Sequence, residues 1–576
     1  MNKYITWTVF LISIAVYYPL FFSSGTLSSG DWPYVYQEHM QELSLFEPPY
    51  IWLEPYYRAT AKLGFAAGLP WEISERLFWF LPIVVLSIFG SYQLTKSWIG
   101  SLIYATNTYV LMLIDGGQLG VAMGYAIIPL VVDACKALTG EGVTASTRQR
   151  VKDLLSFVLY FSLVLMFDVR MGFIAGIVCF LFGIIHLLTS QNRRAVGKQV
   201  LLTGTLAIFL ICVLNAFWLM PLVVSGIGSL TGPSDSIYTS SDALSYFSVA
   251  RFPQSFSLLH PNWPENIFGK VYLMKPEFLF LSLVAFMSIM TVSAKKTKSS
   301  HPIVLFFILI ALTGSFLSKG VNEPFGFVYT WLFDYVPGFM MFRDPTKFYA
   351  LTALSYSVLI PHTLLHISRR ACTALTVLFV ALWIYLLHPV WTGNLDGTFT
   401  PEEVPQEYLS FKHMLVSDPT AYTTFWVPVR QRFGYSSETH LAIDSFDRLD
   451  IDSIPVVVDW LESSEAHDQM QQWNVKYIIV PHDSEREIFV EKYEYCDACR
   501  KQIVHRIEQL TWLHRLDMFT RNDVFEVETS EGHVYGEQSE TGNTSVQIGV
   551  FMSAGSLACV ILMYLFLWNK TEKQRS

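Results

Sequence analysis

The stretch YITWTVFLISIAVYYPLFF (residues 4–22) contains no charged residue. An apolar segment of about 20 residues is long enough to cross a bilayer as a helix. It follows Lys3, and no small-residue cleavage site comes after it, so we expect a retained first membrane helix rather than a signal peptide. The chain of 576 residues is 52% hydrophobic and 15% charged, whereas soluble domains carry about 25% charged residues. The composition therefore predicts an integral membrane protein.

Similar apolar windows follow along the chain. With the first they predict about twelve transmembrane helices, near residues 4–22, 75–94, 98–114, 119–138, 154–168, 171–189, 200–223, 277–294, 302–317, 348–366, 373–391 and 546–568. Lys and Arg gather in the loops of one side, at Lys96 and in 144–152, 190–199, 293–301, 368–370 and 569–576. By the positive-inside rule, these loops and both termini are cytoplasmic. The expected fold is a polytopic α-helical membrane protein.

The opposite side carries everything else of size. It holds the long loops 23–74, 224–276 and 318–347 and a polar segment, 392–545. In that segment the patterns predict strands at 423–429, 475–481 and 524–529 and helices at 406–415 and 484–493. We therefore expect a transmembrane domain over 1–391, a small extracytoplasmic α/β domain over 392–545, and a last transmembrane helix with a cytoplasmic tail over 546–576.

Composition also limits the partners. A formal net charge of −9 argues against nucleic acid, which favours a basic face. Cys496 and Cys499 form a CxxC in the polar segment, and the sequence offers no further pair of zinc ligands at matching spacing. A local disulfide is the preferred interpretation in an oxidising compartment. The role of the pair stays open.

Acidic and basic residues gather on the side expected to face outward. Asp31, in SGDWPYVYQEH (29–39), is placed either to cap a short helix or to accept a proton from a substrate. Arg343 and Lys347, in FRDPTKF (342–348), can hold a phosphate just before the tenth span. Further candidates for contacting a substrate are Trp32, Tyr34, Glu38, Asp168, Arg170 and Glu265.

Several of these candidates have structural alternatives. Trp32 and Tyr34 are typical of the aromatic belt at a membrane surface. Asp168 and Arg170 are close enough in sequence to form a salt bridge, and Glu265 stands in a segment rich in turn formers.

The layout resembles the GT-C glycosyltransferases, including arabinofuranosyltransferase-like and YfhO-like proteins. The features that carry the resemblance are Asp31 shortly after the first span, a long first outer loop, many spans and a late outer domain. The resemblance implies that Asp31 is the catalytic base, and that Arg343, with Lys347, binds the phosphate of a polyprenyl-phosphate-linked sugar donor. The acceptor would be an envelope glycan, lipid or protein, and transfer would invert the anomeric carbon on the outer face of the plasma or cytoplasmic membrane.

One feature departs from the family pattern. Many members carry two adjacent acidic residues or an Asp-x-Asp in the first loop, and some use a divalent metal such as Mg²⁺ or Mn²⁺. Here Trp32 and Pro33 follow Asp31. The sequence therefore leaves metal dependence open.

Two other functions compete with glycosyl transfer. The first is a transporter or flippase of a lipid-linked sugar or polymer. Ion-coupled transport needs ionisable groups deep in the bilayer, and the predicted spans hold almost none at their centres. The second is a non-catalytic scaffold of envelope assembly, in which the outer domain is the working part.

Overall fold

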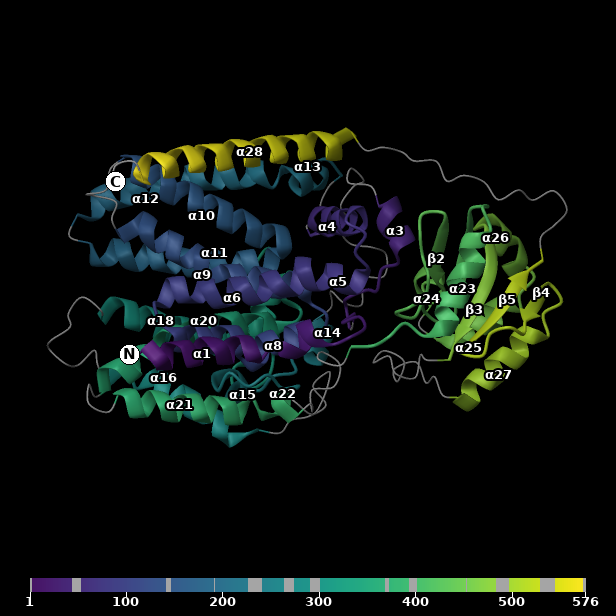
Figure 1. The fold of residues 1–576 in the computed structure, drawn as a ribbon, viewed down its shortest axis with the longest axis horizontal. Helices are drawn as coiled ribbons and strands as arrows, with labels where there is room; N and C mark the ends of the chain where they lie inside the picture. The colour runs from purple at the N-terminus through teal and green to yellow at the C-terminus, as the bar shows by residue number, and fades with distance from the viewer. Residues whose placement is uncertain are drawn as a thin grey trace.

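The computed structural model describes residues 3–28, 30–43, 53–140, 147–190, 192–225, 241–263, 274–290, 301–367, 372–392, 401–451, 453–482, 497–528 and 544–572. A bundle of helices fills one end of the long axis and a five-stranded sheet the other (Figure 1). We call the end of the bundle that faces the sheet the sheet side. α1 begins and α28 ends at the opposite end of the bundle (Figure 1). That this opposite end is cytoplasmic stays a prediction.

The helical part consists of α1 (Lys3–Ala15), α2 (Tyr18–Phe22), α3 (Gln37–Glu42), α4 (Glu54–Ala66), α5 (Trp71–Glu75), η1 (Arg76–Phe80), α6 (Leu81–Thr95), α7 (Trp98–Thr106), α8 (Thr108–Asp115), α9 (Leu119–Gly140), α10 (Thr147–Phe167), α11 (Val169–Thr189), α12 (Arg193–Leu214), α13 (Ala216–Ser225), α14 (Ser241–Phe247), α15 (Phe252–Phe256), η4 (Pro276–Phe278), α16 (Leu279–Phe286), α18 (His301–Ser318), α19 (Gly326–Tyr335), η5 (Phe339–Phe342), η6 (Pro345–Phe348), α20 (Tyr349–Ile367), α21 (Cys372–Leu386), α22 (His388–Thr392) and α28 (Thr544–Glu572).

Five helical segments of the described chain are long and apolar enough to cross a membrane: Trp71–Thr95, Leu119–Thr139, Val169–Thr189, Arg193–Leu214 and Pro345–His366. Shorter apolar helices cover Pro276–Phe286, Pro302–Ser318, Thr373–Leu386 and Ile548–Val560. The protein is thus an integral membrane protein with a mostly helical fold. The number of twelve spans stays a prediction.

Several of the predicted spans are interrupted, and a local reason is clear for two of them. The first apolar stretch breaks between Ala15 and Tyr18, and Pro19 occupies the first turn of α2, where its missing N–H costs nothing. The stretch 98–114 breaks at Asn107, whose side chain accepts hydrogen bonds from the backbone of Tyr109 and Val110 and caps α8. A cap and a proline therefore divide what hydrophobicity alone predicts as continuous helices.

The sheet part consists of α23 (Gln406–Ser417), β1 (Tyr422–Trp426), β2 (His440–Asp444), α24 (Ser445–Leu449), α25 (Ile454–Leu461), α26 (Ala466–Gln472), β3 (Val475–Pro481), α27 (Asp497–Glu508), β4 (Leu513–Leu516) and β5 (Asn522–Val527). The strand order is β2-β1-β3-β5-β4. β1 pairs in parallel with β2 and β3, whereas β5 is antiparallel to β3 and β4. The strands predicted at 423–429, 475–481 and 524–529 correspond to β1, β3 and β5, and β2 and β4 are additional edge strands.

Two apolar cores hold the sheet part together. Phe425 and Trp426 alternate across β1, so one faces a core with α25 and α27 and the other a core with α23. The helix predicted at 406–415 corresponds to α23. The helix predicted at 484–493 and Cys496 lie outside the described residues, so the proposed disulfide is not described either.

The sheet part rests on the first long loop of the helical part. Thr26 and Glu402 exchange two backbone hydrogen bonds of 2.9 and 3.0 Å. The Tyr36 hydroxyl donates to the Phe433 carbonyl at 2.8 Å, and Lys412 Nζ lies 2.8 Å from Glu38 Oε1. The loop that carries Asp31 is therefore held between the bundle and the sheet.

Candidate functional site

Asp31 lies at the sheet side, exposed to solvent. Its backbone N–H donates to the Gly116 carbonyl at 2.9 Å, which fastens the first loop to the turn between α8 and α9. Gly30 makes this approach feasible, because its φ is +55° and a Cβ there would lie 2.4 Å from the Gly116 oxygen. The Asp31 Oδ2 accepts a hydrogen bond from Gln118 Nε2 at 3.3 Å. Asp31 is thus fixed in place with its carboxylate accessible.

Gln118 connects Asp31 to a buried ion pair. Its Oε1 accepts from Lys347 Nζ at 2.6 Å, and the same ammonium lies 2.6 Å from Asp344 Oδ2. The Lys347 side chain is only 2% exposed. The order of contacts is therefore Asp31, Gln118, Lys347 and Asp344, with the neutral amide of Gln118 between Asp31 and the lysine.

The ion pair is maintained by its surroundings. Burial alone would raise the pKa of Asp344, but the Lys347 ammonium and hydrogen bonds from the Thr346 backbone and hydroxyl hold that pKa at about 2. Asp344 is therefore ionised at neutral pH and unsuited to accept a proton.

Asp168 and Arg170 lie together, as their spacing suggests. The Asp168 Oδ1 caps α11 by accepting from the Met171 N–H at 3.0 Å, and its Oδ2 lies 2.7 Å from an Arg170 nitrogen. Asp168 is only 2% exposed. Arg170 also interacts electrostatically with Asp344, so the two ion pairs are neighbours. The contacts match the structural alternative for Asp168, a cap combined with a salt bridge.

The aromatic and acidic candidates of the first loop lie in packed surroundings. Trp32 is 5% exposed and stacks on Trp71 with ring centroids 5.6 Å apart. Tyr34 packs edge-on against Phe433 of the sheet part. Glu38 pairs with Lys412, so it belongs to the contact between the two parts of the chain. These three residues build the loop, and Glu265 lies outside the described residues.

The two basic residues of FRDPTKF point to different surroundings. Arg343 is exposed, and its guanidinium lies 5.6 Å from the centroid of the Phe247 ring. Lys347, four residues later, is buried against Gln118 and Asp344. Arg343 follows η5 directly, whereas Lys347 lies within η6. Of the two basic residues, Arg343 is the exposed one.

Glu75 was missed by the sequence analysis although it builds the site. It is fully buried. Its carboxylate accepts hydrogen bonds of 2.7 to 3.4 Å from four groups of the first loop: the Thr26 and Ser28 hydroxyls, the Leu27 N–H and the Trp32 indole. Arg76 lies 3.6 Å away and donates to the Leu20 carbonyl. A signal existed in the sequence, because Glu75 and Arg76 adjoin an otherwise apolar window.

His260 is a second residue that the analysis did not single out. It lies close to Asp344 and Lys347, and its backbone N–H donates to the Thr108 hydroxyl at 2.8 Å. Burial lowers the pKa of His260 to about 3, although the Asp344 carboxylate acts in the opposite direction. The imidazole is therefore neutral at physiological pH.

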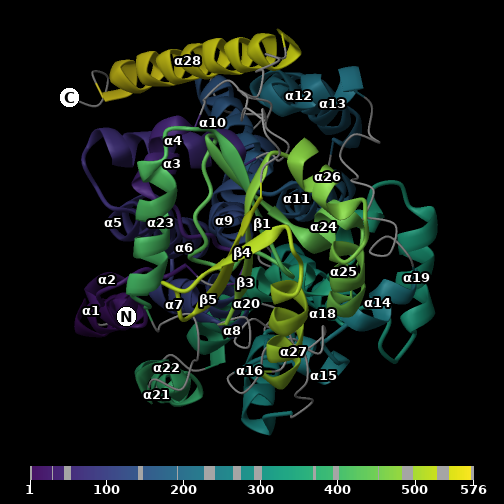
Figure 2. The ribbon, with the colours of Figure 1, turned by 90° about the vertical axis from the view of Figure 1, so that its right-hand side faces the viewer.

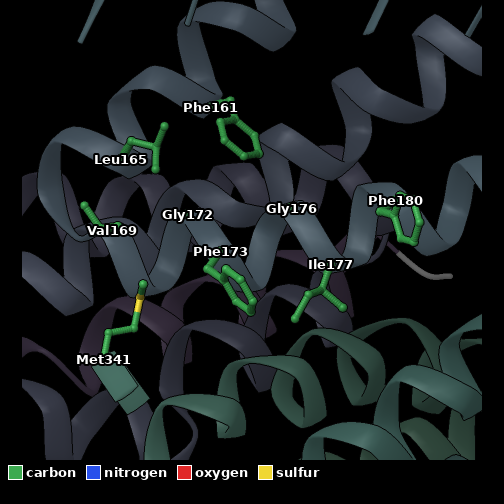
Figure 3. Close-up of a pocket in the computed structure, with 9 residues that line it drawn as sticks. All are labelled: Phe161, Leu165, Val169, Gly172, Phe173, Gly176, Ile177, Phe180 and Met341. Carbon is green, nitrogen blue, oxygen red and sulfur yellow. The ribbon is translucent and has the colours of Figure 1, made fainter. Parts of the chain in front are cut away.

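An apolar groove of about 460 Å³ opens beside this cluster, between α10, α11 and η5 (Figure 3). Phe161, Phe173 and Met341 project toward it, and Gly172 and Gly176 leave room along α11. Val169, adjacent to Arg170, and Met341, two residues before Arg343, also line it. The groove therefore ends near charged residues of the site.

The described residues include no group of three His, Cys, Asp or Glu side chains that could hold a metal ion. Asp31 offers a single exposed carboxylate, while Asp344 and Asp168 are engaged by Lys347 and Arg170. These residues do not fit a metal site.

The fold resembles that of a known glycosyltransferase. It matches the cryo-EM structure of the arabinofuranosyltransferase AftD from Mycobacteria with a TM-score of 0.60 and 12% sequence identity over 92% of this chain. A mutant form of AftD matches with a TM-score of 0.50 and the same 12% identity. The chain spans only 40% and 42% of those AftD chains. No protein-family model and no curated protein matches the chain. The similarity shows that this chain shares its fold with part of AftD.

Proposed function

We propose that this protein is a membrane glycosyltransferase that moves a sugar from a polyprenyl-phosphate-linked donor to an envelope glycan, lipid or protein. The observation that carries the proposal is the exposed Asp31 carboxylate, fastened beside the Gln118–Lys347–Asp344 cluster on a GT-C-like fold. A buried ion pair one amide away gives the site a fixed electrostatic framework. The sheet side is then the outer face.

The proposed reaction needs one base and one leaving group. Asp31 takes the proton of an acceptor hydroxyl, and the resulting oxygen attacks the anomeric carbon of the donor sugar. The bond from that carbon to the phosphate oxygen breaks, and the polyprenyl phosphate leaves with the electron pair. A single displacement of this kind inverts the anomeric carbon. The proton leaves Asp31 to water afterwards.

The basic residues divide the remaining tasks. The exposed Arg343 guanidinium can make two parallel hydrogen bonds to a phosphate, which Lys347 in its buried position cannot. We therefore assign phosphate binding to Arg343. Lys347 instead holds Gln118, and through it the orientation of Asp31.

The groove between α10 and α11 is suited to the donor's hydrocarbon chain. Its described lining is apolar (Figure 3). Two lining residues are close in sequence to the arginines: Val169 precedes Arg170, and Met341 lies two residues before Arg343. A chain bound there would direct its phosphate toward the charged end of the site. Burial of apolar surface would provide the affinity, at about 25 cal/mol per Å².

The test is incorporation of labelled sugar into envelope glycans by cells that carry wild-type protein, Asp31→Asn or no protein. Asn keeps the size and capping ability of Asp31 but cannot take a proton. We expect Asp31→Asn to lower the rate of sugar incorporation by about 10²–10⁴-fold, because that is the usual contribution of a general base. The matched control is Asp517→Asn, which changes a carboxylate that is 94% exposed in the sheet part.

Each outcome separates the candidate functions. Loss of incorporation by Asp31→Asn at a normal membrane level supports the base, provided that Asp517→Asn behaves like wild type. Normal incorporation by Asp31→Asn would overturn the role of Asp31. If the deletion also incorporates sugar normally, the protein is not the transferase, and transport of a lipid-linked sugar or scaffolding becomes the better function.

A further inference from the structure

α19 separates its aromatic residues onto two opposite faces. Tyr329 and Phe333 are buried, with exposed fractions of 1% and 2%. Phe327, Trp331 and Tyr335, spaced four residues apart, are 71%, 55% and 71% exposed. A spacing of four places these three side chains along one stripe of the helix. We call them the aromatic stripe.

The buried face of α19 fixes the helix to the bundle. The Tyr329 ring packs on Phe339 at 5.3 Å, and its hydroxyl donates to the Phe342 carbonyl at 2.6 Å. Phe339 and Phe342 in turn pack against Phe348, the last residue of η6. The stripe is therefore held outward by a packed aromatic cluster.

The position of α19 in the chain indicates its depth relative to the membrane. It lies between α18, which ends at Ser318, and the span that begins at Pro345. Figure 2, viewed from the sheet side, shows α19 at the rim of the molecule, beside α14 and away from the sheet. A short helix that joins two apolar helices at the rim is expected near the level at which those helices leave the membrane.

The residue types of the aromatic stripe are those found at a membrane surface. Trp and Tyr are enriched where hydrocarbon meets headgroups, because their rings are apolar and their N–H or O–H can still reach polar atoms. Met340 is also exposed, at 48%, and the next residue, Met341, lines the apolar groove. Apolar side chains are therefore also exposed in η5, which follows α19 in the chain.

We propose that α19 lies in the interfacial layer of the bilayer on the sheet side, with Phe327, Trp331 and Tyr335 inserted among the lipid headgroups and upper acyl chains. The occupant of this surface is membrane lipid. The inference is independent of the transfer chemistry, because it rests on exposure and position alone. Its consequence is that α19 sets the height of Arg343 and η6 relative to the membrane.

The experiment places a photoreactive benzoylphenylalanine at Phe327 or Trp331 of the full chain in phospholipid nanodiscs. The replacement keeps an aromatic ring at each position. Two reference positions bracket the result: Leu201 on α12, 69% exposed within a candidate span, and Met518 in the sheet part, 70% exposed. After irradiation, mass spectrometry of the intact protein identifies the adducts.

We expect lipid adducts at Phe327 and Trp331 at a yield comparable to Leu201 and several-fold above Met518. A yield equal to that of Met518 would overturn the proposal, because the stripe would then face water. A cross-link to a second copy in place of lipid would also overturn it, since the stripe would then be a protein interface. Thermal unfolding of each labelled variant checks that it is folded.

Discussion

Two carboxylates of the same loop system are held in opposite ways. Asp31 is exposed and accepts one side-chain hydrogen bond, of 3.3 Å, from Gln118. Glu75 is fully buried and accepts from four groups of the first loop, with Arg76 close by. One of these groups is the indole of Trp32, the residue directly after Asp31.

The difference shows how a reactive position is built in this protein. A base must keep an oxygen accessible to the substrate, so it cannot be saturated with donors. A buried carboxylate must be saturated, because each unmet donor or acceptor there costs about 1–3 kcal/mol. Glu75 therefore accepts the hydrogen bonds that hold the first loop, while the Asp31 carboxylate stays accessible. If Asp31 is the base that we propose, Glu75 is a positioning residue for it.

The largest effect that we expect is the loss of stability when the Glu75 carboxylate is removed. Glu75→Ala removes the partner of Arg76 and four acceptor contacts, and we expect it to lower the free energy of unfolding by about 3–5 kcal/mol. Glu75→Gln keeps the shape and one acceptor oxygen, and should lose about 1–3 kcal/mol. Thermal unfolding in nanodiscs measures both.

The control for Glu75 is Glu72→Gln, on the same helix and half-buried, with one contact of 3.4 Å from Tyr34. It should change the unfolding temperature little. If Glu75→Ala were as stable as Glu72→Gln, the buried contacts would not hold the first loop. Partial recovery of transfer in Glu75→Gln relative to Glu75→Ala would identify positioning as the function of Glu75.

A smaller effect is expected at Gly30, which decides how closely Asp31 approaches the α8–α9 turn. Gly30→Ala forces a left-handed φ of +55° on a residue with a Cβ and brings that atom against the Gly116 carbonyl. We expect a loss of stability of about 1–3 kcal/mol and a fall in kcat.

Gly68→Ala is the matched control, because Gly68 has a φ of +68° and nothing within 4 Å of its Cβ position. It isolates the cost of the backbone conformation from that of the clash. Equal unfolding temperatures and equal transfer rates for the two variants would show that the Gly116 contact does not position Asp31.

Asp344 differs from both Asp31 and Glu75 because it forms a short ion pair with Lys347. Its pKa of about 2 in the folded protein is below the ordinary aspartate value of about 3.9. A lowered folded pKa contributes stability above the unfolded pKa, and this contribution disappears as the pH falls from about 4 to about 2. Asp344→Asn should therefore be less stable than wild type at neutral pH, and the difference should shrink across that window.

Unfolding curves of the two proteins, recorded in parallel from neutral pH downward, test this expectation. The difference between them isolates Asp344 from other groups, such as Asp418 in the sheet part, whose pKa is also about 2 and lowered by Lys476 against the opposing effect of burial. A difference that stays constant with pH would contradict the ion pair as the source of the stability.

The smallest effect is expected away from both carboxylates, in the groove. Gly176→Leu adds a side chain where the nearest other atom, Phe161 Cζ, is 3.7 Å from the Cβ position, so it fills the groove without a backbone clash. We expect a higher KM for a long-chain polyprenyl donor and an unchanged kcat. Gly183→Leu, on the same helix with open space around it, should leave KM unchanged. A rise in KM for both variants would contradict a specific groove.

Much of the fold could be predicted from the pattern of apolar residues. The strands β1 and β3 follow from short apolar runs and the helix α23 from helical periodicity, which are local patterns that need no distant partner. The edge strands β2 and β4 could not be predicted, because each is short and is defined by pairing with a neighbour. Pro19 and Asn107 were visible, yet whether they end a helix depends on local capping within a hydrophobic run.

The sequence by itself determined the membrane character, the polar segment after residue 392 and the candidate residues Asp31 and Arg343, because composition and charge are properties of the chain. Three findings depend on how distant segments pack. Lys347 points inward to Gln118 and Asp344. Asp168 caps α11 and pairs with Arg170, and Glu75 accepts hydrogen bonds from the loop of Asp31. The physical reason is that a charged residue's role depends on what meets it when distant segments pack. Gln118 lies 87 residues from Asp31 and 229 from Lys347, and no local pattern encodes those contacts.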